Sequence, residues 1–212
     1  MTLRTYPRFI TLEGGEGAGK STVLSALREV LHETGREVVS TREPGGTPLS
    51  EQIRGLLLDP HHETPTIDTE VLLMFAAGAQ PVRETILPAL ERDAWVISDR
   101  FTDASYAYQG AARGGDPVFI AELERRVVGI APALTLLLDV PVAVGLQRAR
   151  GRGAADRIEG ERDDFFERVR EGYLARAAAE PARFRVVDAT HSPHTVAADA
   201  VAHMRRLIGE VS

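Results

Sequence analysis

The chain has 212 residues, a length typical of one domain that buries a single sizeable hydrophobic core. Hydrophobic residues make up 43% and charged residues 26% of the chain, which excludes a largely disordered protein. The net charge is −6 and cysteine is absent. We therefore expect no extended contact with nucleic acid or an anionic membrane, and no disulfide or thiolate-bound metal.

The N-terminus has no apolar signal core, and no apolar run approaches the roughly 20 residues that a membrane-spanning helix needs. A chain without cysteine also fits a reducing compartment, so we expect a cytoplasmic protein. Lys20 is the only lysine among 25 basic residues. Either an arginine-rich composition left one lysine there by chance, or position 20 requires an ammonium group in particular.

Five short runs rich in apolar and β-branched residues predict strands. They lie at residues 9–12, 38–41, 95–98, 134–138 and 184–187. Between them, apolar residues at helical spacing predict helices. These lie at residues 21–34, 49–58, about 69–90, 117–128, 142–150, 165–179 and 195–208. Pro81 and Pro88 fall inside the third helix, where we expect a kink or a break.

Strands that alternate with helices are typical of a parallel sheet with helices on both faces, so we expect one α/β domain over residues 1–212. Residues 148–161 are rich in glycine and carry four arginines, namely Arg148, Arg150, Arg152 and Arg157. This composition fits a short mobile lid that closes over a bound phosphate. A solvated arginine-rich surface has the same composition.

Residues 14–21 match the phosphate-binding pattern G-x-x-x-x-G-K-[ST] between a predicted strand and a predicted helix. Glycines let successive backbone N–H groups point at phosphate oxygens, and the helix N-terminus adds its positive dipole end. Lys20 would reach the β- and γ-phosphates, and the Ser21 hydroxyl would hold Mg²⁺. The residues expected to surround ATP are Gly14, Gly15, Glu16, Gly17, Ala18, Gly19, Lys20, Ser21 and Thr22.

This P-loop pattern occurs in switches, motor ATPases and small-molecule kinases. A guanine-reading Asn-Lys-x-Asp loop is excluded because the one lysine lies in the P-loop, and the chain is short and acidic for a motor. A kinase needs arginines that neutralise the transferring phosphoryl group. Arg100 follows Asp99 at the end of a predicted strand, where ligands bind in open α/β folds. Asp99 is the expected Mg²⁺ carboxylate, and Asp139 at the end of another strand competes with it.

Four blocks of the sequence resemble those of bacterial thymidylate kinases. They are the strand and P-loop at 9–22, Thr-Arg-Glu-Pro-Gly-Gly-Thr at 41–47, Ala-Tyr-Gln-Gly at 107–110 within 99–110, and Asp-Arg-Ile-Glu at 156–159. The resemblance implies a P-loop NTPase fold with a five-stranded parallel sheet. It also implies transfer of the γ-phosphate of ATP to dTMP, giving dTDP and ADP for dTTP biosynthesis, with Mg²⁺ as cofactor and a homodimer as the assembly.

The resemblance also implies roles for single residues. Arg54 and Arg100 are expected to hold the dTMP phosphate, and Arg100 also to bridge the donor and acceptor phosphates. Phe75 is expected to stack on thymine. Pro44, as a cis peptide, is expected to turn the chain so that Glu43 reaches the sugar 3′-hydroxyl.

Three residues of the Ala-Tyr-Gln-Gly block and its approach complete the expected acceptor site. Gln109 and Ser105 are expected to reach the base or its neighbourhood, since a glutamine amide offers both a donor and an acceptor. Tyr108 is expected near the sugar, where crowding would reject a 2′-hydroxyl.

The resemblance further implies which part of the chain touches the γ-phosphate. P-loop residues 15–18 contain no arginine, so the lid is expected to supply it, through Arg152 or Arg157. The family usually carries Ala-Ala-x-Arg after the stacking aromatic residue, and the segment after Phe75 lacks that arginine. Arg83, one turn further along, is the expected substitute.

Two other functions remain open at this point. The first is a P-loop kinase for a different nucleotide or a nucleoside, which the altered segment after Phe75 keeps in consideration. The second is a regulatory protein that binds ATP without turnover, although such a protein has no need for lid arginines or acceptor-side motifs.

Overall fold

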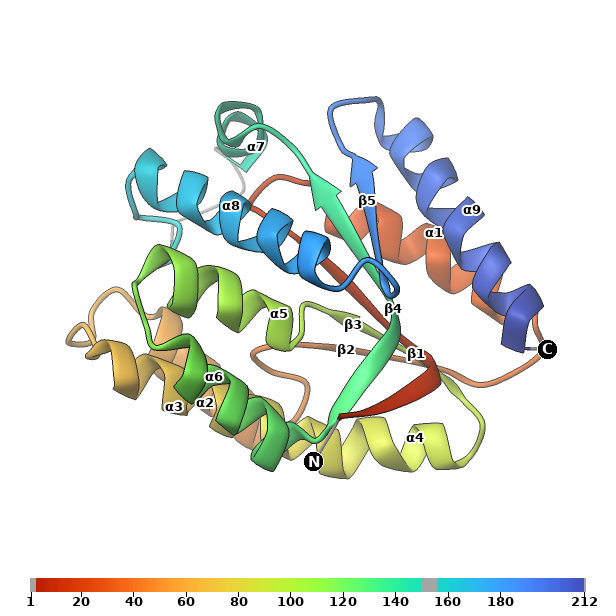
Figure 1. The fold of residues 1–212 in the computed structure, drawn as a ribbon, viewed down its shortest axis with the longest axis horizontal. Coiled ribbons are helices and arrows are strands. Elements are labelled where there is room, and N and C mark those ends of the chain that lie inside the picture. Colours follow the sequence, from red (N-terminus) through yellow and green to blue (C-terminus); the bar gives the residue numbers. More distant parts are fainter. Residues whose placement is uncertain (1–2, 150–155, 212) are drawn as a thin grey trace.

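The computed structural model describes residues 3–149 and 156–211. Within them, five strands form one sheet in the order β2-β3-β1-β4-β5, and every pairing is parallel. The strands are β1 (Arg4–Gly14), β2 (Val38–Arg42), β3 (Trp95–Asp99), β4 (Ile130–Asp139) and β5 (Phe184–Asp188). The expected five-stranded parallel sheet is therefore confirmed (Figure 1).

The helices of the described residues follow the strands in alternation. The α-helices are α1 (Lys20–His32), α2 (Pro48–Leu58), α3 (Ile67–Pro81), α4 (Leu87–Glu91), α5 (Thr102–Ser105), α6 (Pro117–Leu123), α7 (Val142–Ala149), α8 (Asp163–Ala179) and α9 (Pro193–Val211). Three π-helical segments, η1 (Val82–Ile86), η2 (Tyr106–Ala112) and η3 (Glu124–Val128), continue α3, α5 and α6. In the described part of the chain, no helix is long and apolar enough to cross a membrane.

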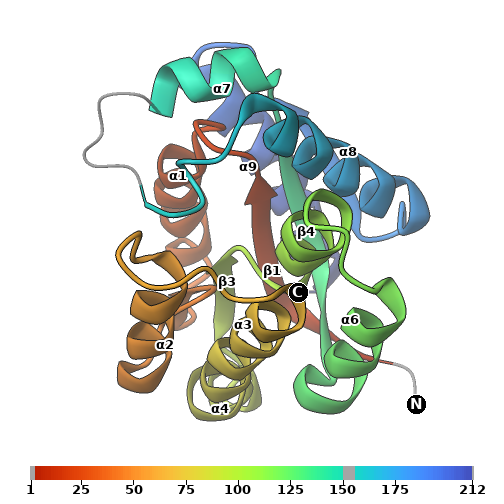
Figure 2. The ribbon, with the colours of Figure 1, turned by 90° about the vertical axis from the view of Figure 1, so that its left-hand side faces the viewer.

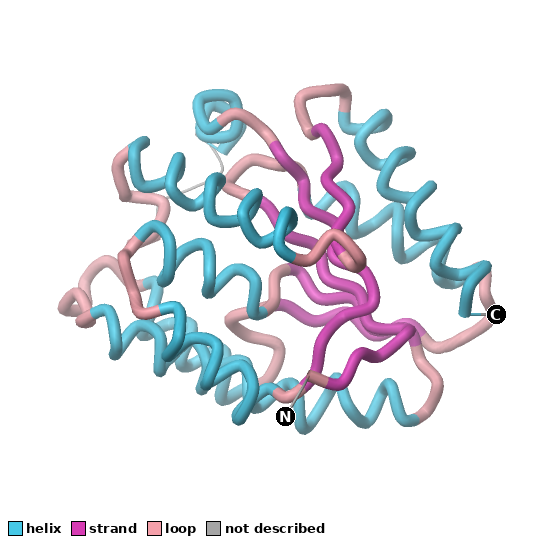
Figure 3. The backbone as a smooth tube through the Cα atoms, in the orientation of Figure 1, coloured by secondary structure: helices cyan, strands magenta, loops and turns pink. Residues whose placement is uncertain are grey.

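Two helical layers cover the two faces of the sheet (Figures 1 and 2). Successive strand residues point to opposite faces, so Ile10 packs toward α1 and α9 while Phe9 packs toward α3, η1 and α6. Leu27 of α1 and Met204 of α9 are fully buried against the first face. The magenta strands in Figure 3 lie between these layers, and β4 is buried on both faces over most of its length. This explains why β4 is a continuous apolar run rather than an alternating one.

The predicted helix over residues 69–90 continues past its prolines but changes its winding there. Helix α3 ends at Pro81, the π-helical turn η1 follows, and α4 has Pro88 near its N-terminus. A proline ring removes one N–H and clashes with the preceding turn, and the wider π-helical turn accommodates both effects. The helical segment over α5 and η2 was not predicted, because its tyrosines, serine and glycine give no clear helical periodicity.

The C-terminal ends of the parallel strands lie at the same edge of the sheet. Gly14, Arg42, Asp99 and Asp139 are the last residues of β1, β2, β3 and β4, and Arg42 lies in register with Asp99. Strand β1 is longer than the predicted run at 9–12 and has a register shift against β4 in the segment that contains its proline. Ligands of open α/β folds bind at this edge, so a ligand-binding site is expected here.

Candidate active site

The P-loop runs from the end of β1 to the start of α1 and is shaped by glycines. Gly14, Gly17 and Gly19 have φ values of 140°, 69° and 92°, which favour glycine over residues with a side chain. A Cβ atom on Gly17 would lie 1.9 Å from the carbonyl oxygen of Gly145, so the loop fits directly against α7. No side chain caps Gly19 at the N-terminus of α1 in the described structure, which leaves the first helical N–H groups for an anion.

Lys20 extends back over this loop. Its Nζ donates to the carbonyl oxygens of Gly14 at 3.2 Å and Gly15 at 3.4 Å. Burial, with the positive charge of Arg100 as a second cause, lowers the pKa of Lys20 to about 8. A bound phosphate would add negative charge beside this ammonium group and favour its charged form.

Arg100 lies directly after β3 in a left-handed conformation, with φ of 67°. Two backbone contacts hold it there: its N–H donates to the Leu12 carbonyl at 2.9 Å, and the Ser98 hydroxyl donates to its own carbonyl at 2.6 Å. A non-glycine residue keeps such a conformation only where its surroundings enforce it. The turn aims the guanidinium at the P-loop, where it bonds the Gly14 carbonyl at 2.9 Å and the Glu16 carboxylate at 2.7 Å.

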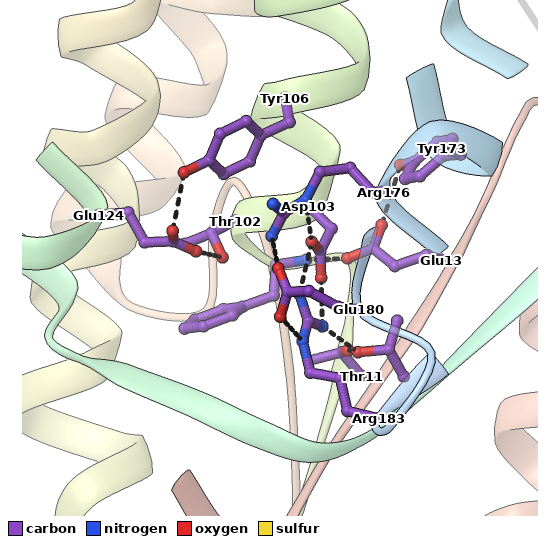
Figure 4. A network of polar contacts seen from close by, with 12 residues as sticks. Thr11, Glu13, Thr102, Asp103, Tyr106, Glu124, Tyr173, Arg176, Glu180 and Arg183 are labelled. Carbon is purple, nitrogen blue, oxygen red and sulfur yellow. Dashed lines mark hydrogen bonds and ion pairs between the residues drawn. The ribbon is translucent and has the colours of Figure 1, made fainter. Parts of the chain in front are cut away.

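Arg100 contacts a buried polar network through Tyr173, and Figure 4 shows this network around Glu13, Tyr173 and Asp103. Arg100 also donates to the hydroxyl oxygen of Tyr173 at 2.9 Å, and that hydroxyl donates to Glu13 at 2.9 Å. Glu13 is fully buried, and burial raises its pKa well above the ordinary value. Its second oxygen accepts the Phe101 N–H at 2.7 Å, while Arg176 and Arg183 hold the neighbouring Asp103. These buried contacts hold the Arg100 guanidinium in place.

The two carboxylates that compete for Mg²⁺ occupy different surroundings. Asp139 forms a bidentate pair with Arg170 at 2.7 and 2.9 Å. Asp99 lines the same cavity as Ser21, and its buried Oδ1 has no hydrogen-bond partner among the described residues. The described residues hold no cluster of three or more acidic or histidine side chains that could bind a metal. The donors present fit Mg²⁺, which is usually held by one or two protein oxygens, water and substrate phosphates.

One cavity of about 350 Å³ joins the P-loop to a second wall of side chains. The wall includes Glu43, Arg54, Met74, Tyr108 and Gln109, which come from the loop after β2, from α2, from α3 and from η2. A cavity of this volume suits a small organic ligand. Ligand atoms at the P-loop end of the cavity would meet backbone amides and cations. Ligand atoms at the second wall would meet a mixed apolar and polar surface.

The loop after β2 places Glu43 in this wall. The peptide bond between Glu43 and Pro44 is cis, as expected, and the Pro44 carbonyl accepts from the Arg54 guanidinium at 2.8 Å. Burial raises the pKa of Glu43 to about 8, with smaller contributions from Glu124 and Asp103. Arg54 itself points into the cavity beside the P-loop.

Phe75 lies behind the lining of the cavity, and its expected stacking on thymine stays a prediction. Its ring is buried in the core with Val71, Val82 and Phe101, and it is not among the residues that line the cavity. The neighbouring Met74 lines the cavity instead. Residues one position apart on a helix point about 100° away from each other, and here Met74 faces the cavity while Phe75 faces the core.

Arg83 also lies away from the cavity, and its expected part in base recognition stays a prediction. Its guanidinium donates to the Val127 carbonyl at 3.3 Å, and Arg83 does not line the cavity that the described residues form. Gly78 faces the site in this part of α3. A Cβ atom there would lie 3.0 Å from Oε2 of Glu43, so helix and carboxylate meet closely. Sequence reasoning missed both Met74 and Gly78, although their spacing of one helical turn was a usable signal.

The segment that ends in the Ala-Tyr-Gln-Gly motif contributes three buried residues beside the cavity. Tyr108 donates to Glu16 at 3.1 Å, and the Arg100 guanidinium lies 4.8 Å from its ring centre. Gln109 lines the cavity, whereas Ser105 is buried next to it without lining it. The Ser105 hydroxyl has no hydrogen-bond partner within the described residues, so its expected contact with the base stays a prediction.

The lid arginines are only partly described. Arg150 and Arg152 lie outside the described residues. Arg148 donates to the Ala189 carbonyl at 2.8 Å, near the P-loop. Arg157 turns away from the P-loop, because its guanidinium pairs with Glu70 at 2.7 Å and is 9% exposed. Contact of Arg157 with a γ-phosphate would require this pair to open.

Comparisons with known proteins identify the family. The thymidylate kinase family model matches residues 12–200. The chain belongs to the thymidylate kinase family. A thymidylate kinase of Alcanivorax borkumensis is 56% identical over 89% of this chain and 91% of its own length, and one of Chromohalobacter salexigens is 56% identical over 94% and 96%. The crystal structure of thymidylate kinase from Ehrlichia chaffeensis superposes with a TM-score of 0.77 at 31% identity, covering 94% of this chain and 98% of that one.

Proposed function

We propose that this thymidylate kinase family member transfers the γ-phosphate of ATP to dTMP, giving ADP and dTDP for dTTP synthesis. One observation carries the proposal: the P-loop and the wall that holds Arg54, Tyr108 and Gln109 line a single cavity. A phosphoryl donor and a nucleotide acceptor can therefore meet in line within it. Phosphoryl transfer depends mainly on such positioning and on neutralisation of charge.

On the donor side, the P-loop amides of residues 14–22 surround the ATP phosphates. Lys20 neutralises charge on the β- and γ-phosphates, and a lysine suits this role as a compact point charge. Ser21 and Asp99 would hold Mg²⁺, which when bound neutralises charge between the donor phosphates. The unpartnered Oδ1 of Asp99 supports this assignment over Asp139, which Arg170 already occupies.

On the acceptor side, Arg54 binds the dTMP phosphate, and Arg100 lies between donor and acceptor because it bonds the P-loop through Glu16 and Gly14. Glu43 accepts or donates at the sugar 3′-hydroxyl. Met74 supplies the apolar face for the thymine ring.

Two residues of η2 complete the acceptor site. The Tyr108 ring packs near the sugar, where its rigid position under Arg100 leaves no room for adjustment to a 2′-hydroxyl. The Gln109 amide reads the edge of the base. No general base is required, since the acceptor phosphate is already anionic near neutral pH.

The test is an acceptor screen with the full chain, ATP and Mg²⁺. We expect ADP formation with dTMP to exceed that with dCMP, dGMP, dAMP and thymidine by at least about 100-fold in kcat/KM. Chromatography of the products identifies dTDP directly. Turnover with another acceptor and none with dTMP would favour the kinase for a different nucleotide, and ATP binding without turnover on any acceptor would favour a regulatory protein.

We further propose a cytoplasmic homodimer. Exposed apolar side chains support the dimer: Ile67 and Leu72 on α3 and Val118 on α6 are 40%, 49% and 74% exposed. These two helices lie side by side on one outer face of the molecule (Figure 2). Light scattering is expected to give twice the mass of one chain, and Leu72→Glu is expected to shift the protein toward the monomer.

A further inference from the structure

Glu70 lies behind the acceptor wall, and of the contacts described above it takes part only in the ion pair with Arg157. It sits in the first turn of α3 and is 2% exposed, although it carries a charge. A buried carboxylate is retained only where partners balance it. Its partners therefore indicate what its position does for the site.

Three side chains meet at this carboxylate, two from η2 and its C-terminal end and one from the segment before α8. The Arg157 guanidinium bonds Oε2 at 2.7 Å, and Nε of Arg113 lies 3.5 Å from Oε1. The Gln109 amide nitrogen donates to Oε1 at 2.9 Å. The two guanidinium groups balance the negative charge, and the carboxylate then acts toward Gln109 as an acceptor only.

An acceptor-only partner determines which way the Gln109 amide faces. With the amide turned over, its carbonyl oxygen would face a carboxylate oxygen at hydrogen-bond distance, and two acceptors repel. The observed orientation leaves Oε1 of Gln109 buried at the cavity wall without a partner among the described residues. The second N–H of the amide also remains for a ligand. Gln109 thus presents one acceptor and one donor to the cavity, and the orientation of its amide is fixed.

We propose that Glu70 is a positioning residue that fixes the Gln109 amide and so selects the base. In this fixed orientation, Oε1 accepts from a ring N3–H and the free N–H donates to a ring carbonyl, which suits a 2,4-dioxopyrimidine. A 4-aminopyrimidine has the opposite pattern, an acceptor at N3 beside an amino donor, and it fits only the turned amide. This inference rests on the proposed function, because it places a pyrimidine base against Gln109.

The experiment compares kcat/KM for dTMP and dCMP in the full-length enzyme and in Glu70→Gln. Glutamine at position 70 offers either an oxygen or an amino group, so the Gln109 amide can adopt both orientations. We expect the dTMP:dCMP ratio to fall by at least about tenfold, through a higher KM for dTMP and a lower KM for dCMP, with KM for ATP unchanged. A general loss of structure would instead weaken the use of dTMP, dCMP and ATP together.

Arg113→Lys is the matched control, since it changes a side chain beside Glu70 but keeps the positive charge and the carboxylate in place. The ratio is expected to stay within about twofold of the native value. If Glu70→Gln does not fold, Gln109→Met tests the same point and is expected to lower the ratio without affecting ATP. An unchanged ratio in the folded Glu70 variant, or in Gln109→Met, overturns the inference. A native enzyme that does not phosphorylate dTMP rejects the proposed function instead.

Discussion

The donor side and the acceptor side of the cavity are built in different ways. The P-loop is eight consecutive residues that present backbone amides, and its shape depends on glycines and on the junction of β1 with α1. The acceptor wall is assembled from side chains of separate segments. Arg157 lies 87 residues from its partner Glu70, and Gln109 lies 39 residues from the same carboxylate.

This difference has a consequence for mutation. A backbone cradle tolerates changes in most side chains, so its function depends on the few groups that carry charge, above all Lys20. A wall of side chains depends on packing and on hydrogen-bond partners, so single changes there should alter KM and selectivity for the acceptor more than the rate of transfer. The predictions below test this division between the two sides.

The largest effect is expected for Lys20→Met. Loss of the ammonium group removes charge neutralisation at the transferring phosphoryl group, and kcat should fall by at least about 10³-fold. Lys20→Arg should also be poor, because a planar guanidinium is bulkier than an ammonium group in a loop that already contacts α7. Steady-state kinetics measure both, with thermal unfolding as the control for folding. Near-native turnover of Lys20→Arg would show that position 20 needs only a positive charge.

Arg100→Ala is expected to lower kcat by about 10²–10³-fold while the affinity for ATP changes little. The side chain belongs to both sides of the cavity, since it bonds Gly14 and Glu16 yet lies beside Tyr108. Nucleotide binding is measured by titration and turnover by a coupled assay. Tyr173→Phe, which removes one support of the guanidinium, should give a smaller fall of the same kind. Equal losses of ATP affinity and turnover would contradict a bridging position.

The donor side could be predicted from the sequence almost completely, because the motif is contiguous and its flanking elements are the ones it requires. The acceptor side could be predicted only in part. Adjacent residues such as Met74 and Phe75 have similar hydrophobicity, and the face that each one presents depends on how α3 packs against the sheet. The Glu70 contacts were not predicted at all, since no sequence pattern shows that α3, η2 and the segment before α8 meet at one carboxylate.

A pair of substitutions on α3 tests the exchange of roles between neighbours. Met74→Ala should raise KM for dTMP by about tenfold and leave KM for ATP unchanged, since it removes apolar contact with the base alone. Phe75→Leu should lower the free energy of unfolding by about 1–3 kcal/mol and change KM for dTMP by less than about twofold. Kinetics and denaturant unfolding on the same preparations separate the two. The reverse pattern would return the base contact to Phe75.

The smallest effect is expected from the charge of Glu43. A carboxyl group whose pKa is higher in the folded chain than in the unfolded chain binds its proton more tightly when folded. Its contribution to stability is therefore greatest below the ordinary value near 4.5 and is lost as the pH rises toward about 8. Glu43→Gln carries no proton to lose, so its melting temperature relative to the native protein should rise by several degrees between pH 5 and pH 8. Lys20 titrates in both proteins, so the difference isolates Glu43. A difference that stays constant with pH would mean that the buried carboxyl group is charged throughout, and its part in the acceptor wall would then be that of an acceptor only.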